Sequence, residues 1–136
     1  MGRVMPTCLA LVLCKSVHRS SRNREPVIVR AFEFFAASSF PAPSGPFTVW
    51  MQLRDGNGET AMGLAVEHVP SGALETEEIV TIRFSLNFAS PNLVLEHEAV
   101  FDAGLPLARE GRYRLRLTAH GVTLMQRYFG VFRTDV

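Results

Sequence analysis

The sequence is poor in cysteine, and this shortage excludes two classes of protein. Its only two cysteines, Cys8 and Cys14, lie six residues apart in an apolar segment. An extended segment of that length separates them by about 20 Å, whereas the Cα atoms of a disulfide lie within about 7 Å of each other. We therefore expect neither a disulfide framework nor a thiolate zinc site. Both cysteines are expected to pack as small apolar side chains.

An excess of one charge and a long apolar run are also missing. Fourteen basic and thirteen acidic residues give a net charge of +1, so no global field attracts nucleic acid or an anionic membrane. We do not expect nucleic acid as a partner. No run reaches the roughly 18 apolar residues of a membrane-spanning helix.

The apolar N-terminal segment poses a choice between a strand and a processed signal. No small-x-small cleavage motif follows it, and Leu13 stands before Cys14 where a lipoprotein box has a small residue. A strand is therefore favoured, and a processed signal stays open as the alternative. A cytoplasmic location is the resulting expectation.

What the sequence has is a large apolar content with a period of two. The chain has 136 residues, 47% of them apolar and ten of them Phe, which predicts one domain over residues 1–136 with one core. Apolar and polar residues alternate most clearly in residues 80–88 and 113–119, as in half-buried strands. No segment has a convincing helical period. The predicted strands are 7–17, 26–35, 47–53, 60–69, 80–88, 92–101, 113–119 and 122–132.

Turn residues between these strands predict how they are connected. The residues at 55–58 predict a hairpin between 47–53 and 60–69, and His120-Gly121 predicts one between 113–119 and 122–132. Tyr113, shortly after Gly111, resembles the tyrosine corner of immunoglobulin-like Greek-key domains. We therefore predict an all-β, immunoglobulin-like Greek-key β-sandwich of about 7–8 antiparallel strands. A further turn is expected at 70–72.

Several segments together resemble a known family. Residues 7–17, 25–32, 39–41 and 111–115 are similar to an uncharacterised bacterial family of small immunoglobulin-like β-sandwich domains. The chain departs from this family at two places. It has Lys15 where the family has an acidic residue, and it has Arg24-Glu25 where the family has Gly-Lys. The resemblance implies the fold and a cytoplasmic location, and it implies no activity.

Residue patterns for catalysis or metal binding are missing. His97 lies between Glu96 and Glu98, but neighbours in a strand point to opposite faces, so the three cannot chelate one ion. His97 is expected in the core or at the sheet rim. There is no Gly-x-Ser-x-Gly motif and no phosphate-binding glycine loop. We expect a protein that is not an enzyme and that has no cofactor and no metal.

Two sets of arginines are candidate surfaces. Residues 15–24 form a basic loop with Arg19, Arg22 and Arg24, which could contact phosphates. A solvated loop is favoured because no aromatic residue is interleaved for stacking. The second set projects from one face of the predicted strand 113–119, where cross-strand pairing with glutamates such as Glu96 and Glu98 is favoured over an anionic partner. Its members are Arg112, Arg114 and Arg116.

Apolar residues in excess of one core face suggest an interface. Residues 7–13 are apolar on both faces, Phe34 lies in a second apolar segment, and Trp50 falls on an otherwise polar strand face. One face of each sandwich strand meets the core, so the surplus needs another cover. We therefore predict a non-catalytic interaction or structural module that acts through self-association, as a homo-oligomer, or through a protein partner. The candidate apolar contacts are Leu9, Leu11, Phe34 and Trp50.

Two other functions stay open at this stage. One is a small-ligand domain, carbohydrate-like in specificity, with the ligand stacked on an exposed Trp50. The other is contact with an anion or nucleic acid through the basic loop 15–24.

Overall fold

The computed structural model describes residues 4–70 and 76–135, all of them in strands, turns and loops. No helix long and apolar enough to cross a membrane occurs among these residues. The turn expected at 70–72 lies partly outside the described residues. The strands are β1 (Thr7–Arg19), β2 (Pro26–Ala31), β3 (Phe34–Ala37), β4 (Ala42–Pro43), β5 (Phe47–Arg54), β6 (Gly58–Val69), β7 (Glu77–Phe88), β8 (Leu95–Phe101), β9 (Pro106–Leu107), β10 (Gly111–Ala119) and β11 (Val122–Arg133).

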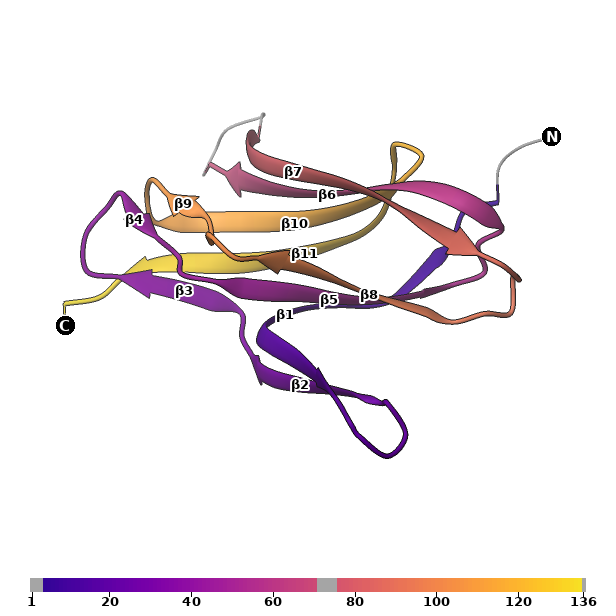
Figure 1. Cartoon of the computed structure of the whole chain (residues 1–136). Helices are drawn as coiled ribbons and strands as arrows, with labels where there is room; N and C mark the ends of the chain where they lie inside the picture. The colour runs from indigo at the N-terminus through magenta and orange to yellow at the C-terminus, as the bar shows by residue number, and fades with distance from the viewer. Residues whose placement is uncertain (1–3, 71–75, 136) are drawn as a thin grey trace.

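Two sheets form the layers of a sandwich (Figure 1). The first has the strand order β2-β1-β5-β8 and the second has the order β3-β11-β10-β6-β7. The chain alternates between them: β5 lies in the first sheet, β6 and β7 in the second, β8 in the first, and β10 and β11 in the second. This is the Greek-key order of an immunoglobulin-like β-sandwich. The predicted all-β, immunoglobulin-like sandwich is confirmed, but the described residues form eleven strands instead of about 7–8, and β3 pairs with β11 in parallel.

The core lies between the sheets and follows the predicted alternation. On β5, every second side chain from Phe47 to Leu53 is almost fully buried, and on β10 the same holds from Tyr113 to Ala119. The Phe47 ring stacks on Phe101 of β8 with centroids 4.6 Å apart. The Tyr113 hydroxyl donates a hydrogen bond to the Arg109 carbonyl at 2.7 Å. The tyrosine corner predicted from residues 111–115 is therefore confirmed.

The hairpin predicted between residues 47–53 and 60–69 is wrong. β5 pairs with β1 and β8, whereas β6 pairs with β10 and β7. The connection crosses the end of the core, where a Cβ at Gly56 would lie 2.5 Å from the Phe88 ring. Residues 55–58 therefore connect β5 of the first sheet to β6 of the second. The strand predicted at 26–35 is likewise divided into β2 and β3, which lie in different sheets.

A β-bulge in β1 overturns one expectation about the N-terminal leucines. The pairing of β1 with β5 shifts register between Cys8 and Ala10. A one-residue shift reverses which face a side chain occupies. As a result Leu9 is 42% exposed, whereas Leu11 is 3% exposed and belongs to the core. Leu11 is therefore a core residue, and its prediction as an interface residue is wrong.

The second half of β1 separates from β5 and pairs with β2 alone, as a hairpin. Pairing with β5 ends at Cys14, while pairing with β2 continues to Arg19. Arg19 Nη1 lies 2.6 Å from Glu96 Oε2 on β8, and Arg19 Nη2 lies 3.8 Å from Glu98. Because β5 separates β1 from β8 in this sheet, Arg19 reaches β8 across the outer face of β5.

The outer face of β5 carries Trp50, which is only 7% exposed. Its indole Nε1 has no hydrogen-bond partner among the described residues. The expectation of an exposed Trp50 is therefore wrong, because the β1–β2 hairpin passes over its strand. The structure offers no stacking platform at this residue.

Candidate functional site

Exposed aromatic side chains gather on the outer face of β3 and β11. Phe34 is 57% exposed, Phe132 is 55% exposed and Tyr128 is 41% exposed. The Phe34 and Phe132 rings contact each other with centroids 5.9 Å apart. Arg112 of β10 lies over the Tyr128 ring, with its guanidinium carbon 3.8 Å from the centroid. We call these four residues the aromatic patch.

Gly130 leaves room for the Phe132 ring to lie against the backbone of β11. It lies between Tyr128 and Phe132 on the same face and pairs with Phe34 of β3 and with Arg112 of β10. A Cβ at Gly130 would lie 2.6 Å from the Phe132 ring. The ring therefore rests directly on the glycine backbone. Beside it is a hollow of about 490 Å³, with Tyr128, Phe132 and Arg112 in its wall.

The sequence identified Phe34 and Arg112 but missed Tyr128 and Phe132. Their positions follow from the alternation of β11, in which Phe129 and Val131 face the core. The same parity places residues 128, 130 and 132 outside. The alternation of β11, together with the position of Phe34, could have predicted that Tyr128 and Phe132 lie on the outer face.

Arg114 and Arg116 converge on a buried carboxylate. Arg114 Nη2 lies 2.8 Å and Arg116 Nε 3.2 Å from the same oxygen of Glu67, on the neighbouring strand β6. Burial opposes ionisation of Glu67, but hydrogen bonds from Arg116 and Arg114 hold its pKa below the ordinary value. Cross-strand ion pairing is therefore confirmed for these two arginines. The expected partners were wrong, because Glu96 and Glu98 face Arg19.

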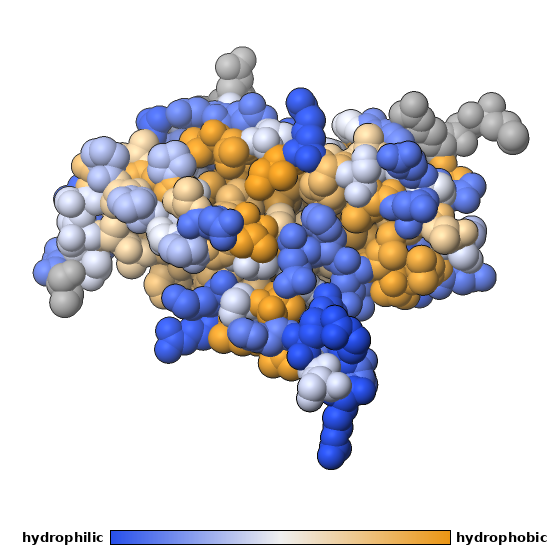
Figure 2. All heavy atoms as spheres, viewed as in Figure 1, coloured by the Kyte–Doolittle hydropathy of each residue, from blue (hydrophilic) through white to orange (hydrophobic). Residues whose placement is uncertain are grey.

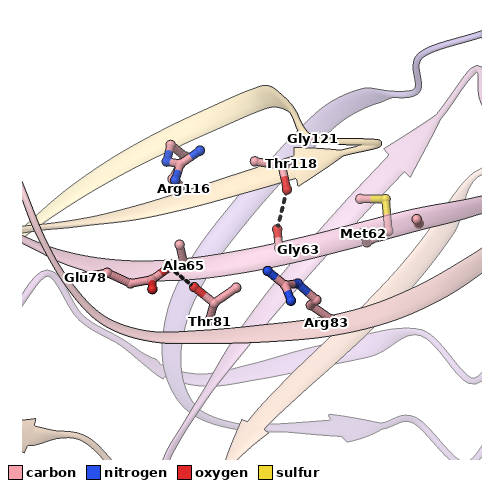
Figure 3. Close-up of a pocket in the computed structure, with 10 residues that line it drawn as sticks. Met62, Gly63, Ala65, Glu78, Thr81, Arg83, Arg116, Thr118 and Gly121 are labelled. Atoms are coloured by element: carbon pink, nitrogen blue, oxygen red, sulfur yellow. Dashed lines mark hydrogen bonds between the residues drawn. The ribbon is translucent and has the colours of Figure 1, made fainter.

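A polar trough runs along the outer face of β6 (Figure 3). Its walls include Arg116 and Thr118 of β10 and Thr81 and Arg83 of β7, and Gly63 lies in its floor. The Thr118 hydroxyl donates a hydrogen bond to the Gly63 carbonyl at 3.4 Å, and the Thr81 hydroxyl donates one to the Glu78 carboxylate. Arg116 is engaged by Glu67. Most hydrogen-bond donors of the trough are thus bonded within the protein. Of its two arginines, Arg83 has no ion pair with a described residue.

The two histidines nearest the core, His68 and His97, pack against aromatic rings. The His97 ring stacks on Phe84 with centroids 4.3 Å apart, and His68 packs edge-on against Tyr113. Burial lowers the pKa of both, and for His68 the nearby Arg109 adds to the effect. Burial therefore favours the neutral form of both rings. Within residues 4–70 and 76–135, no three His, Cys, Asp or Glu side chains are grouped so that they could hold a metal ion.

The remaining candidate residues lie on or near the N-terminal hairpin, but not in one surface. Arg19 bridges the hairpin to β8, while Arg22 and Arg24 lie at its tip with exposed side chains. Leu9 is exposed on β1, away from this tip. The structure therefore does not bring the predicted apolar residues Leu9, Phe34 and Trp50 into one surface.

No family model matches the sequence, and no curated protein matches it. Several solved structures match the chain at low sequence identity. A β-glucosidase from Listeria innocua in complex with isofagomine matches with a TM-score of 0.50 and 8% identity, over 98% of this chain and 17% of that chain. A β-glucosidase from Kluyveromyces marxianus matches with a TM-score of 0.46 and 12% identity, over 74% of this chain and 15% of that chain.

An immunoglobulin-like protein from Pseudomonas aeruginosa is of similar length. It matches with a TM-score of 0.42 and 13% identity, over 96% of this chain and 99% of that chain. This chain spans less than a fifth of the length of either β-glucosidase. At such identities the likeness concerns the fold alone, since one fold hosts many functions.

Proposed function

We propose that this chain is a non-catalytic interaction module that associates with a second copy of itself through the aromatic patch. One observation carries the proposal: three aromatic side chains, each more than two-fifths exposed, lie on one face beside an arginine. Aromatic residues and arginine are the types most enriched at the centres of protein interfaces. An exposed group of this kind is more often an interface than an ordinary surface.

The charges at the patch favour a second copy. Arg112 lies over the Tyr128 ring, and Glu33 lies in the wall of the adjoining hollow. In a two-fold interface the same surface meets itself, so each border must offer both charge signs to avoid repulsion. Arg112 of one copy can therefore face Glu33 of the other across such an interface. A border of one sign would instead have favoured a partner of the opposite charge.

The test is the solution mass of the purified chain, measured by light scattering on a sizing column at micromolar concentration. We expect a discrete dimer that survives high salt, because an apolar interface is little affected by screening. The double variant Phe34→Ser, Phe132→Ser should be monomeric. The matched control is Val100→Ser, which removes an equally exposed apolar side chain from β8 of the other sheet.

The outcomes separate the alternatives. A dimer in the control and a monomer in the double variant supports the patch as the interface. A monomeric wild-type chain refutes self-association, and then a different protein must cover the patch. Dimers in all three proteins would place the interface elsewhere on the molecule.

A further inference from the structure

Five of the fourteen basic residues of this chain lie in one projecting element. Residues 15–31, the distal part of the β1–β2 hairpin, contain five Lys and Arg and one acid, Glu25; we call this segment the basic hairpin. Its net charge is +4, so the rest of the chain carries −3 of the total of +1. The near-neutral total therefore conceals a strong separation of charge.

Most of these cations have no ion-pair partner among the residues that the structure describes. Lys15, Arg22, Arg24 and Arg30 are exposed, and none has an ion pair with another described residue. Arg19 differs, because it ties the base of the hairpin to β8. In the rest of the described chain most arginines are paired with carboxylates. Four unpaired cations on one element are thus a local feature that internal salt bridges do not explain.

The basic hairpin is an ordered two-stranded ribbon. Its turn is closed by backbone hydrogen bonds from Ser20 N to Glu25 O and from Arg24 N to Ser20 O, both 2.9 Å long. The Asn23 side chain accepts a further bond from Glu25 N at 3.1 Å. The ribbon projects from the sandwich at the lower edge of Figure 1, and Figure 2 shows a hydrophilic arm at the bottom of the same view.

We propose that the basic hairpin binds double-stranded DNA by entering its major groove and contacting phosphates, without sequence preference. A major groove about 12 Å wide admits a two-stranded β-ribbon, whereas the major groove of duplex RNA is too narrow for side chains to enter. Arginine forks match phosphate geometry. No Phe, Tyr or Trp lies within residues 15–31 to stack on unpaired bases, which favours a duplex over a single strand.

The charge of the rest of the molecule confines the contact to the hairpin. A body of net charge −3 is repelled by the phosphate backbone, so the ribbon alone should reach the duplex. With four cations in contact, the logarithm of the binding constant should fall with the logarithm of salt concentration with a slope of about −3.6. The slope therefore counts the phosphate contacts that the proposal predicts.

The test is fluorescence anisotropy of a labelled DNA duplex of mixed sequence, titrated with the full chain between about 50 and 200 mM salt. The test variant is Arg22→Gln with Arg24→Asn. Asparagine is chosen at 24 because this residue has φ 58°, a left-handed conformation that asparagine tolerates. The matched control is Arg54→Gln with Arg83→Gln, which removes the same charge from the body. Both pairs are exposed, and equal melting temperatures establish that the fold is retained.

We expect the test variant to bind more weakly and to have a slope that is smaller by about 2. We expect the control to keep the slope of the wild type and to lose less affinity than the test variant. No binding to the duplex at about 50 mM salt would overturn the proposal. Equal losses in the two variants would also overturn it, because they would indicate a diffuse charge effect. Binding to phosphatidylserine vesicles without binding to the duplex would assign the hairpin to a membrane surface instead.

Discussion

Two leucines of β1 provide a matched test of the described register. Leu9 and Leu11 share a residue type, a strand and a sequence parity, yet Leu9 is 42% exposed and Leu11 is 3% exposed. The bulge between Cys8 and Ala10 is the cause of the difference. Substituting each leucine by alanine therefore probes the bulge directly, since the chemistry removed is the same in both variants.

The expected magnitudes follow from burial. Leu11→Ala removes core volume and leaves a cavity, which costs about 3 kcal/mol or more of the free energy of unfolding. For a chain of 136 residues this corresponds to a fall of roughly 10 °C in Tm. Leu9→Ala removes a side chain that is largely in water, so its cost should stay below about 1 kcal/mol.

Urea denaturation followed by circular dichroism measures both costs. Each variant should keep the m-value of the wild type, so the difference should lie in the midpoint. The reasoning would be refuted if the two variants lost similar stability. Such a result would mean that residues 9 and 11 face the same side and that the bulge is absent.

Three further predictions concern single contacts. Tyr113→Phe removes the hydroxyl that bonds to the Arg109 carbonyl, so we expect a loss of about 1 kcal/mol in the same urea experiment; an unchanged midpoint would contradict the tyrosine corner. The lowered pKa of Glu67 means that this carboxylate stabilises the fold at neutral pH, and that the contribution disappears as the pH falls through its folded-state pKa. Glu67→Gln should therefore flatten the acid limb of a stability–pH curve, and a limb of unchanged steepness would assign acid sensitivity to other groups. Trp50, the single tryptophan, should show blue-shifted emission and weak quenching by acrylamide, and Arg19→Ala should increase quenching by loosening the hairpin above it; strong quenching in the wild type would show that the indole is exposed.

The strands could be predicted from the sequence because burial on one face imposes a period of two. Residues 80–88 and 113–119 alternate without interruption, and the structure has strands there with the predicted faces inward. The tyrosine corner was also predictable, since it depends on a local spacing between Gly111, Tyr113 and the preceding loop. Local pattern and local spacing were sufficient for these features.

The errors arose where long-range packing overrides a local pattern. The residues at 55–58 are typical of a hairpin turn, but β5 and β6 pair with strands far away in the sequence and lie in opposite sheets. The bulge in β1 has no signal in the sequence, because an extra residue in one strand depends on how the partner strand twists. The ion pairs of Arg114 and Arg116 with Glu67 likewise required the register of β6 against β10. Each error concerns which strand lies beside which.

The two regions of surplus apolar surface differ in how the chain covers them. Trp50 lies on the outer face of the first sheet, where the chain itself supplies a cover by returning β1 across β5 and tying it to β8 with Arg19. Among residues 4–70 and 76–135, no such element covers the outer face of β3 and β11, where Phe34 and Phe132 stay more than half exposed.

Burying two such rings would stabilise an interface by about 25 cal/mol for each Å² of apolar surface removed from water. The hairpin that covers Trp50 also carries the unpaired cations, so one element both completes the fold and extends beyond it. Removing its tip should therefore weaken the proposed DNA binding and leave the aromatic patch unchanged. A variant that lost both would show that the two surfaces are coupled.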